Sequence, residues 1–207
     1  MVNSLLLFCY FKFLLNRKYA DIGSTVAQQY SRGYFEVSRW ADIVTVHALP
    51  GEGILKAMET EAEKLDVPRG CFLLAEMSSE GNLISDDYIK GGLHKLKQIL
   101  VMLNSGVFVA TIKMAENYPR IVAGLVCQSE QLADSHGMLQ LTPGVRRGQV
   151  KEDGLGQRWV TPEEAVIDKC GDVIVVGRGI TLAKEPASEA KIYQAELWTA
   201  YEKRLSQ

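Results

Sequence analysis

The chain has 207 residues, of which 47% are apolar and 23% are charged, and its net charge at pH 7 is -2. This length and composition are typical of one soluble globular domain, here residues 1–207. A net charge so close to zero provides no general attraction to nucleic acid or to an anionic membrane, so neither is an expected partner. The expected partner is a small molecule.

The cysteines and the N-terminal segment both indicate a reducing compartment. The four cysteines are widely spaced, with no CxxC pair and no histidine at metal-ligand spacing, which argues against a disulfide framework or a zinc site. Residues 5–11 form an apolar run like the core of a signal peptide, but no basic segment precedes it and Lys12 interrupts it. The predicted location is therefore the cytoplasm.

Residues 16–25 place an amine, a carboxylate and hydroxyl groups within a few positions of one another, directly after an apolar run that can form a strand. A carboxylate such as Asp21 near Lys18 keeps the amine charged and holds it in position, as a site of proton transfer requires. The alternative is a solvated turn in which Ser24 or Thr25 caps the following helix.

Strand-like and helix-like segments alternate along the rest of the chain. Continuous apolar runs predict buried strands at residues 43–46, 71–75, 121–126, 139–141 and 172–176. Helical spacing and cap signals predict helices at residues 26–40, 54–65, 86–98, 161–171 and 193–205. The clearest start is the capping box at residues 161–164, with Gly171 ending that helix. Residues 99–113 fit neither period and are interpreted as a hairpin turning at residues 104–106.

Strands that are apolar on both faces are typical of a parallel sheet covered by helices, in either a doubly wound fold or a (β/α)8 barrel. A barrel gathers the carboxyl ends of its strands at one mouth, and polar residues follow the predicted strands here, so the barrel is preferred. These polar residues are His47, Ser78, Gln128, Thr142 and Arg178.

Among these strand ends, residues 177–179 carry the clearest chemical signal. Two glycines allow backbone N–H groups to approach an anion, and Arg178 adds a fixed charge. The alternative is a glycine turn with a surface arginine. His47 is interpreted as a histidine whose hydrogen bonds are satisfied, and Ser78 as a hydrogen-bond donor to a ligand, because no base lies beside it.

Five ordered motifs resemble orotidine 5′-phosphate decarboxylase, most closely the eukaryotic type that forms the C-terminal part of UMP synthase. The motifs are residues 17–25, 75–79, 141–145, 154–157 and 176–179. The resemblance covers residues 17–98 and 114–207. It implies a (β/α)8 barrel that works as a homodimer and converts orotidine 5′-monophosphate to uridine 5′-monophosphate without metal or organic cofactor.

The same resemblance implies a role for each matching residue. Lys18 would protonate the pyrimidine carbon as CO2 leaves, and Asp21, with Ile22 and Thr25, would reach into the site of the neighbouring subunit. The remaining positions implied to bind the substrate are Ser78 and Pro143 at the pyrimidine, and Gln157, Trp159, Gly177 and Arg178 at the phosphate. Trp159 stands where the family has a tyrosine, so that hydroxyl contact is absent.

The chain also departs from the family pattern. The family motif is Asp-x-Lys-x-x-Asp, but its first position here is Asn16, and an amide cannot supply the negative charge of a catalytic carboxylate. Only fifteen residues precede Asn16, so the first two strands of the barrel, with their substrate-contacting lysine, are expected to be missing. Residues 1–15 are an atypical start and residues 99–113 an atypical insertion, and both are consistent with misread exon boundaries.

Two other functions remain open at this point. The departures favour a non-catalytic fragment that binds uridine phosphates or pairs with an intact subunit. Another phosphate-binding barrel, such as a sugar-phosphate epimerase, would explain residues 177–179 but not Lys18 together with Asp21.

Overall fold

The computed structural model describes residues 12–82, 84, 107–130, 137–148, 154 and 156–206. It divides into two compact units, and each unit is built from parallel strands alternating with helices. The first unit takes its described residues from 1–74 and 111–123, and the second from 75–110 and 124–207. The predicted α/β class is confirmed in both.

The first unit contains three parallel strands. Strand β2 pairs with β1 on one side and with β3 on the other, with Val44 opposite both Leu15 and Cys71. In chain order, the elements are β1 (Leu14–Tyr19), α1 (Gly23–Ser31), η2 (Val37–Arg39), β2 (Ile43–His47), α2 (Gly53–Ala62), β3 (Gly70–Leu74) and most of α5 (Val107–Asn117).

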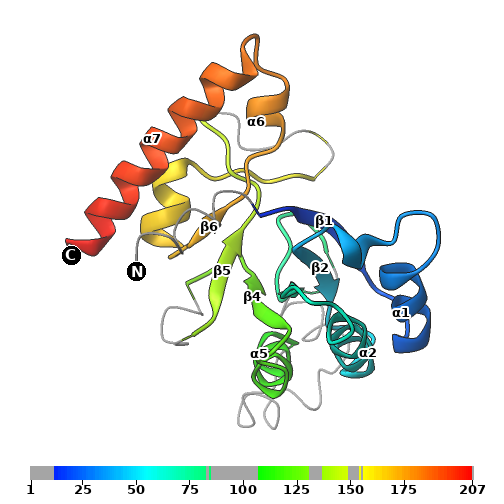
Figure 1. Ribbon diagram of the computed structural model, residues 1–207. Coiled ribbons are helices and arrows are strands. Elements are labelled where there is room, and N and C mark those ends of the chain that lie inside the picture. Colours follow the sequence, from blue (N-terminus) through cyan, green and yellow to red (C-terminus); the bar gives the residue numbers. More distant parts are fainter. Residues whose placement is uncertain are drawn as a thin grey trace, which may run out of the picture. The chain divides into compact units, whose positions relative to one another are not determined.

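The core of the first unit lies between one face of these strands and the helices (Figure 1). Successive side chains of a strand point to opposite faces, so Val44 and Val46 share a face, and both are fully buried. Tyr19 is also buried, and its ring meets that of Tyr30 on α1 edge to face, with the centroids 6.1 Å apart. Helix α2 adds a buried stripe of Ile54, Leu55 and Met58.

The second unit has its own parallel strands. Strand β4 leads into this unit from the first, and β5 pairs with β4 on one side and β6 on the other. The long helix α7 contacts α6 and η3 (Figure 1). The elements are β4 (Val122–Val126), β5 (Leu139–Thr142), η3 (Glu164–Asp168), β6 (Val173–Ile174), α6 (Arg178–Thr181) and α7 (Pro186–Leu205).

The predicted capping box is confirmed at the start of the helix that contains η3. The Thr161 backbone N–H donates to Glu164 Oε2 at 2.7 Å, and the Glu164 N–H donates to Thr161 Oγ1 at 3.2 Å. The helix does not end at Gly171 as predicted, because Cys170 takes the left-handed conformation with φ 57°. Gly171 is needed for space instead, since a Cβ there would lie 2.7 Å from Thr142 Oγ1.

Four further expectations were wrong. The helix predicted at residues 26–40 is α1, which begins at Gly23 and ends at Ser31, and Gly33 follows in a left-handed turn with φ 74°. Its N-cap is Ile22, so the alternative with Ser24 or Thr25 as the cap is also wrong. Residues 107–113 belong to helix α5 and not to a hairpin, because an apolar run can suit either structure. Strand β6 is shorter than residues 172–176. Residues 86–98 and 99–106 lie outside the described residues.

Helices α1 and α2 begin in close contact, and this contact leads to a stability prediction. A Cβ on Gly23 would collide with the backbone carbonyl oxygen of Gly53, whereas a Cβ on Gly53 would meet nothing within 4 Å. We expect Gly23→Ala to lower the free energy of unfolding by about 1–3 kcal/mol, as overpacking does. Urea titration followed by circular dichroism measures this change.

Gly53→Ala is the matched control, because both glycines are the first residue of a helix. It should leave stability unchanged or raise it by up to about 1 kcal/mol, owing to the higher helix propensity of alanine. Equal losses in the two variants would contradict the steric explanation.

Candidate functional site

Four polar side chains of the first unit form a group that we call the amine cluster: Asn16, Lys18, Thr45 and His47. Their strands are β1 and β2, whose other face carries the buried Tyr19, Val44 and Val46. Because side chains alternate along a strand, burying that apolar face directs the polar set to the face away from the helices. Asn16 and Lys18 therefore lie within strand β1, whereas the motif was expected to follow a strand.

The amide of Asn16 organises the amine cluster. Its Oδ1 accepts a hydrogen bond from Lys18 Nζ at 3.1 Å and another from Thr45 Oγ1 at 3.2 Å. An amide oxygen is a neutral acceptor, so it orients the ammonium without cancelling its charge. In the described part of the chain Lys18 forms no ion pair. The structure thus brings Asn16 and Lys18 together, and adds Thr45.

The other residues of the predicted motif lie at the beginning of α1. Asp21 Oδ1 accepts a hydrogen bond from the Ile22 backbone N–H at 2.8 Å, so this exposed carboxylate stabilises the turn between β1 and α1. The Ile22 side chain is 63% exposed, although it is large and apolar. The Thr25 N–H donates to the Ile22 carbonyl oxygen at 3.0 Å. Asp21 and Ile22 therefore remain accessible at the surface of the chain as described.

His47 was predicted to have its hydrogen bonds satisfied, and this was wrong. Its Nδ1 atom is buried and has no hydrogen-bond partner among the described residues. Burial is the main reason that the pKa of His47 lies below its ordinary value of 6.5, and the charge of Lys18 lowers the pKa further. His47 is therefore neutral at pH 7. Thr45 and His47 alternate with valines in β2. This alternation in the sequence could have predicted that both side chains lie on the polar face.

In the second unit the loops after β3 and β5 are joined by the Ser78–Gln157 pair. Ser78 Oγ donates to Gln157 Oε1 at 3.3 Å, and the Glu80 N–H donates to the Gly156 carbonyl oxygen at 2.7 Å. Gly144 lies against this pair with φ 77°, and a Cβ there would be 2.9 Å from Gln157 Nε2. A glycine is thus required where the two loops meet.

Glu76 connects the ends of β3 and β4. Its carboxylate accepts hydrogen bonds from the Gln128 N–H at 2.6 Å and from Ser129 Oγ at 2.9 Å. Burial raises the pKa of the nearby Cys127 thiol to about 12, so this cysteine is not a nucleophile at neutral pH. Gln128 Nε2 in turn donates to the Pro143 carbonyl oxygen at 2.6 Å, which holds the loop after β5.

A third group, the arginine–tryptophan cluster, consists of Arg146, Trp159 and Arg178. The guanidinium carbon of Arg178 lies 4.9 Å from the centroid of the Trp159 ring, and that of Arg146 lies 4.7 Å from it. Both distances are typical of cation–π interactions. The predicted residues Trp159 and Arg178 are thus brought together, while Arg146 was not among the predicted site residues.

The two glycines beside Arg178 have different roles. A Cβ on Gly177 would meet nothing within 4 Å. A Cβ on Gly179 would collide with the hydroxyl of Tyr193 on α7, which also accepts a hydrogen bond from the Arg147 backbone N–H at 2.9 Å. A glycine is therefore required at position 179 because the chain packs against α7 there, and not because an anion must approach.

The described residues contain no group of three or more His, Cys, Asp or Glu side chains that could hold a metal ion. They also contain no helix with the length and apolar character needed to cross a membrane.

Comparison with known proteins identifies close relatives. The family model "Orotidine 5′-phosphate decarboxylase / HUMPS family" matches residues 4–193. The chain is 36% identical to uridine 5′-monophosphate synthase of Bos taurus over 191 residues, covering 92% of the chain and 35% of that protein. It is 35% identical to orotidine 5′-phosphate decarboxylase of Schizosaccharomyces pombe over 193 residues, covering 93% of the chain and 65% of that protein. The chain therefore spans about a third of the first relative and just under two thirds of the second.

A solved structure described as orotidine 5′-phosphate decarboxylase from Lactobacillus acidophilus shares the fold. It matches with a TM-score of 0.60 and 22% identity, covering 95% of this chain and 80% of that chain. The fold is accordingly an α/β barrel of the decarboxylase type, as the sequence predicted. The described residues contain six strands, fewer than the eight that close such a barrel.

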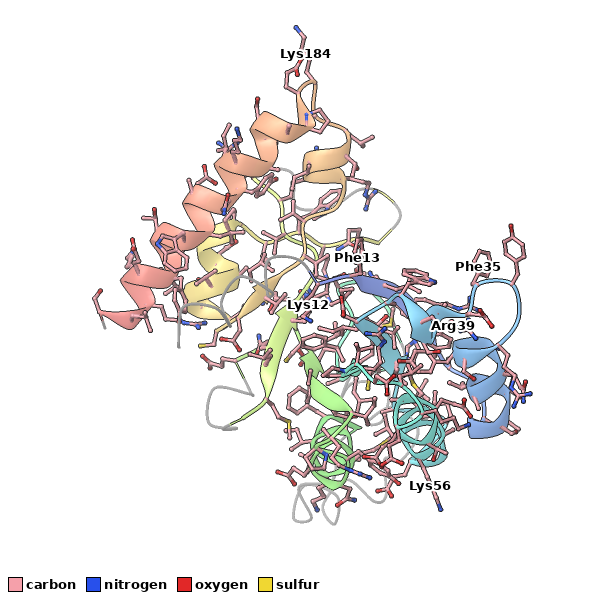
Figure 2. All side chains as sticks on the ribbon, in the orientation of Figure 1. Lys12, Phe13, Phe35, Arg39, Lys56 and Lys184 are labelled. Atoms are coloured by element: carbon pink, nitrogen blue, oxygen red, sulfur yellow. The ribbon has the colours of Figure 1, made fainter. Side chains whose placement is uncertain are left out.

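The amine cluster gives a prediction that can be tested without any ligand. Replacing Lys18 by glutamine removes the positive charge that lowers the pKa of His47, so this pKa should rise, yet stay below 6.5 because burial remains. Titration of the His47 ring signals by NMR measures the change. Lys56→Gln is the control, because Lys56 on α2 projects away from the strands (Figure 2).

The same shift predicts how stability depends on pH. Because folding depresses the pKa of His47, its contribution to stability is present above pH 6.5 and is lost as the pH falls through the folded-state pKa. Lys18→Gln should make this loss smaller. An unchanged His47 titration in Lys18→Gln would show that the two side chains do not interact.

Proposed function

The chain belongs to the orotidine 5′-phosphate decarboxylase / HUMPS family, and on that premise we propose that it acts in the decarboxylation of orotidine 5′-monophosphate to uridine 5′-monophosphate, a step of pyrimidine synthesis. The observation that carries the proposal is the Lys18 ammonium, which Asn16 holds on the polar face of β1 beside a neutral His47. An oriented ammonium can act as a general acid. Because Lys18 lies within a strand, the position of its ammonium is well defined.

The proposed reaction breaks the bond between C6 of the pyrimidine and its carboxylate carbon. CO2 leaves, the electron pair stays on C6, and Lys18 donates a proton to C6 to give uridine 5′-monophosphate. The neutral amine then regains a proton from water. In this proposal Lys18 is the catalytic acid, and Asn16 positions it through the 3.1 Å hydrogen bond. No metal or organic cofactor takes part.

The proposal assigns substrate binding to residues of the second unit. Ser78 would donate a hydrogen bond to the pyrimidine, with Pro143 packing near it, and Gln157, Trp159, Gly177 and Arg178 would hold the phosphate. The fixed loops around Gly144 and the guanidinium of Arg178 on Trp159 support this assignment. Binding energy from the phosphate can then lower the barrier at the distant pyrimidine ring.

We propose further that the active form is a homodimer in the cytoplasm. Asp21, Ile22 and Thr25 would then complete the site of the partner subunit. The exposure of Asp21 and of the large apolar Ile22 side chain supports a partner at this position.

A second candidate function is a binding role without turnover, either alone or paired with an intact subunit. The observation that favours it is Asn16, because the neutral amide leaves Lys18 without an ion pair among the described residues. A carboxylate at this position would also repel the carboxylate of the substrate, and an amide does not. This candidate predicts binding of uridine 5′-monophosphate without formation of CO2.

An absorbance assay of the purified chain with orotidine 5′-monophosphate tests the proposed reaction. We expect slow loss of substrate absorbance, and a further decrease of roughly 10²- to 10⁴-fold in kcat for Lys18→Ala, because the general acid is removed. Lys56→Ala is the control and should retain full activity, since this lysine is exposed on α2. Binding of the nucleotide with no turnover at any enzyme concentration would favour the second candidate.

Restoring the carboxylate at position 16 tests the role of the amide. We expect Asn16→Asp to raise kcat by roughly ten- to a hundredfold, because a carboxylate holds Lys18 charged and repels the substrate carboxylate. The same repulsion should raise KM. Asn16→Ala, which removes the acceptor shared by Lys18 and Thr45, should instead lower kcat. A kcat for Asn16→Asp equal to that of the unchanged chain would show that position 16 has no electrostatic role in the reaction.

A further inference from the structure

The pairing of two loop segments places Arg146 in the arginine–tryptophan cluster. The Arg146 backbone N–H donates to the Val160 carbonyl oxygen at 2.9 Å, and the Val160 N–H donates to the Gly144 carbonyl oxygen at 2.9 Å. Val145 is buried between these bonds. Residues 144–146 and 158–160 are thus held in register, which fixes the backbone of Arg146 beside that of Trp159.

The neighbouring Arg147 has a structural role in this unit, in contrast to Arg146. Its guanidinium pairs with Glu189 at 2.8 Å and with Glu196 at 2.9 Å, so it fastens the loop to α7. Arg146 has no carboxylate partner anywhere in the described ranges, and its guanidinium lies over the indole ring of Trp159. The charge of Arg146 is therefore not neutralised by the described residues.

The charge of Arg146 lies on the same indole ring as the guanidinium of Arg178. Since the guanidinium carbons lie 4.7 Å and 4.9 Å from the same centroid, they are at most about 10 Å apart. The negative face of the indole attracts the Arg146 cation but carries no net charge, so the charge of Arg146 remains available to an anion. An anion bound beside the ring would pair with Arg146, and a dianion more strongly than a monoanion.

We propose that Arg146 is a second phosphate-binding cation of this chain, and that Trp159 is the platform that positions both Arg146 and Arg178. This inference rests on the proposed function, because it takes the phosphate of a uridine nucleotide as the anion. The ligand class is a phosphate monoester in its dianionic form, since Arg146 adds a planar cation to the residues proposed to hold the phosphate. The indole ring of Trp159 would thereby orient the two arginines, whereas the hydroxyl group of a tyrosine at this position would form a hydrogen bond with the phosphate.

Calorimetric titration of the full chain with uridine 5′-monophosphate and with uridine tests the inference. We expect Arg146→Gln to weaken binding of the nucleotide roughly ten- to a hundredfold, the effect of losing a charge-assisted contact, and to leave binding of uridine unchanged. Arg146→Lys, which keeps a charge but not the planar fork, should give an intermediate loss. Arg178→Gln is the positive control.

Arg158→Gln is the matched negative control. It removes the same charge one residue from Trp159, but the side chain is exposed and alternation along the segment directs it away from the Trp159 side. The loss in Arg146→Gln should also grow between about pH 5 and pH 7.5, because the second phosphate ionisation has a pKa of about 6. A residue that only maintains the fold would not produce this pH dependence.

The outcomes separate this inference from the proposed reaction. Dependence of nucleotide binding on Arg146 without decarboxylation would support the inference and contradict the reaction. Decarboxylation with Arg146→Gln binding the nucleotide as tightly as the unchanged chain would overturn the inference alone. Failure of the unchanged chain to bind uridine 5′-monophosphate would overturn both. Equal losses for uridine and its monophosphate in Arg146→Gln would also overturn the inference, because the effect would not involve the phosphate.

Discussion

The two-residue repeat of side chains along parallel strands is the constraint on which the first unit depends. Tyr19 is 2% exposed and Val44 and Val46 are fully buried, because helices α1 and α2 cover that face of the strands. Lys18 and Thr45 must then project from the other face. A shift of β1 by one residue would bury the ammonium among apolar side chains, which costs several kcal/mol. The apolar face therefore sets the register, and the register determines where the amine lies.

The charges of the proposed site are shifted towards positive. In the proposed function, Asn16 stands where a carboxylate would repel the carboxylate of orotidine 5′-monophosphate, and Arg146 would add attraction for the phosphate. Both features would then stabilise the bound substrate. Interactions that are equally strong in the ground state and the transition state increase affinity but do not raise kcat. In this proposal the chain would combine a proton-donating amine with electrostatics that favour binding over turnover, which is why the two proposed roles, enzymatic and binding, are physically so close.

How much of the site could be predicted depended on the distance in sequence between the interacting residues. The capping box was predictable because Thr161 and Glu164 are three positions apart and its pattern is local. Residues 107–113 were assigned to a hairpin because their apolar side chains fit a strand as well as the helix α5. Gly179 was assigned to anion binding, since nothing in residues 177–179 indicates that Tyr193 would occupy the space of a Cβ.

By itself, the sequence determined the alternation of buried strands and helices, the order of the motifs and the presence of an amine near a turn, because each of these is a local pattern. Only the tertiary structure decided that the oxygen of Asn16 serves both Lys18 and Thr45, and that Arg146, not Arg147, lies on Trp159. The physical reason is that hydrogen bonds and cation–π contacts act over a few ångströms, and folding alone brings residues separated by 13 to 29 positions within that range.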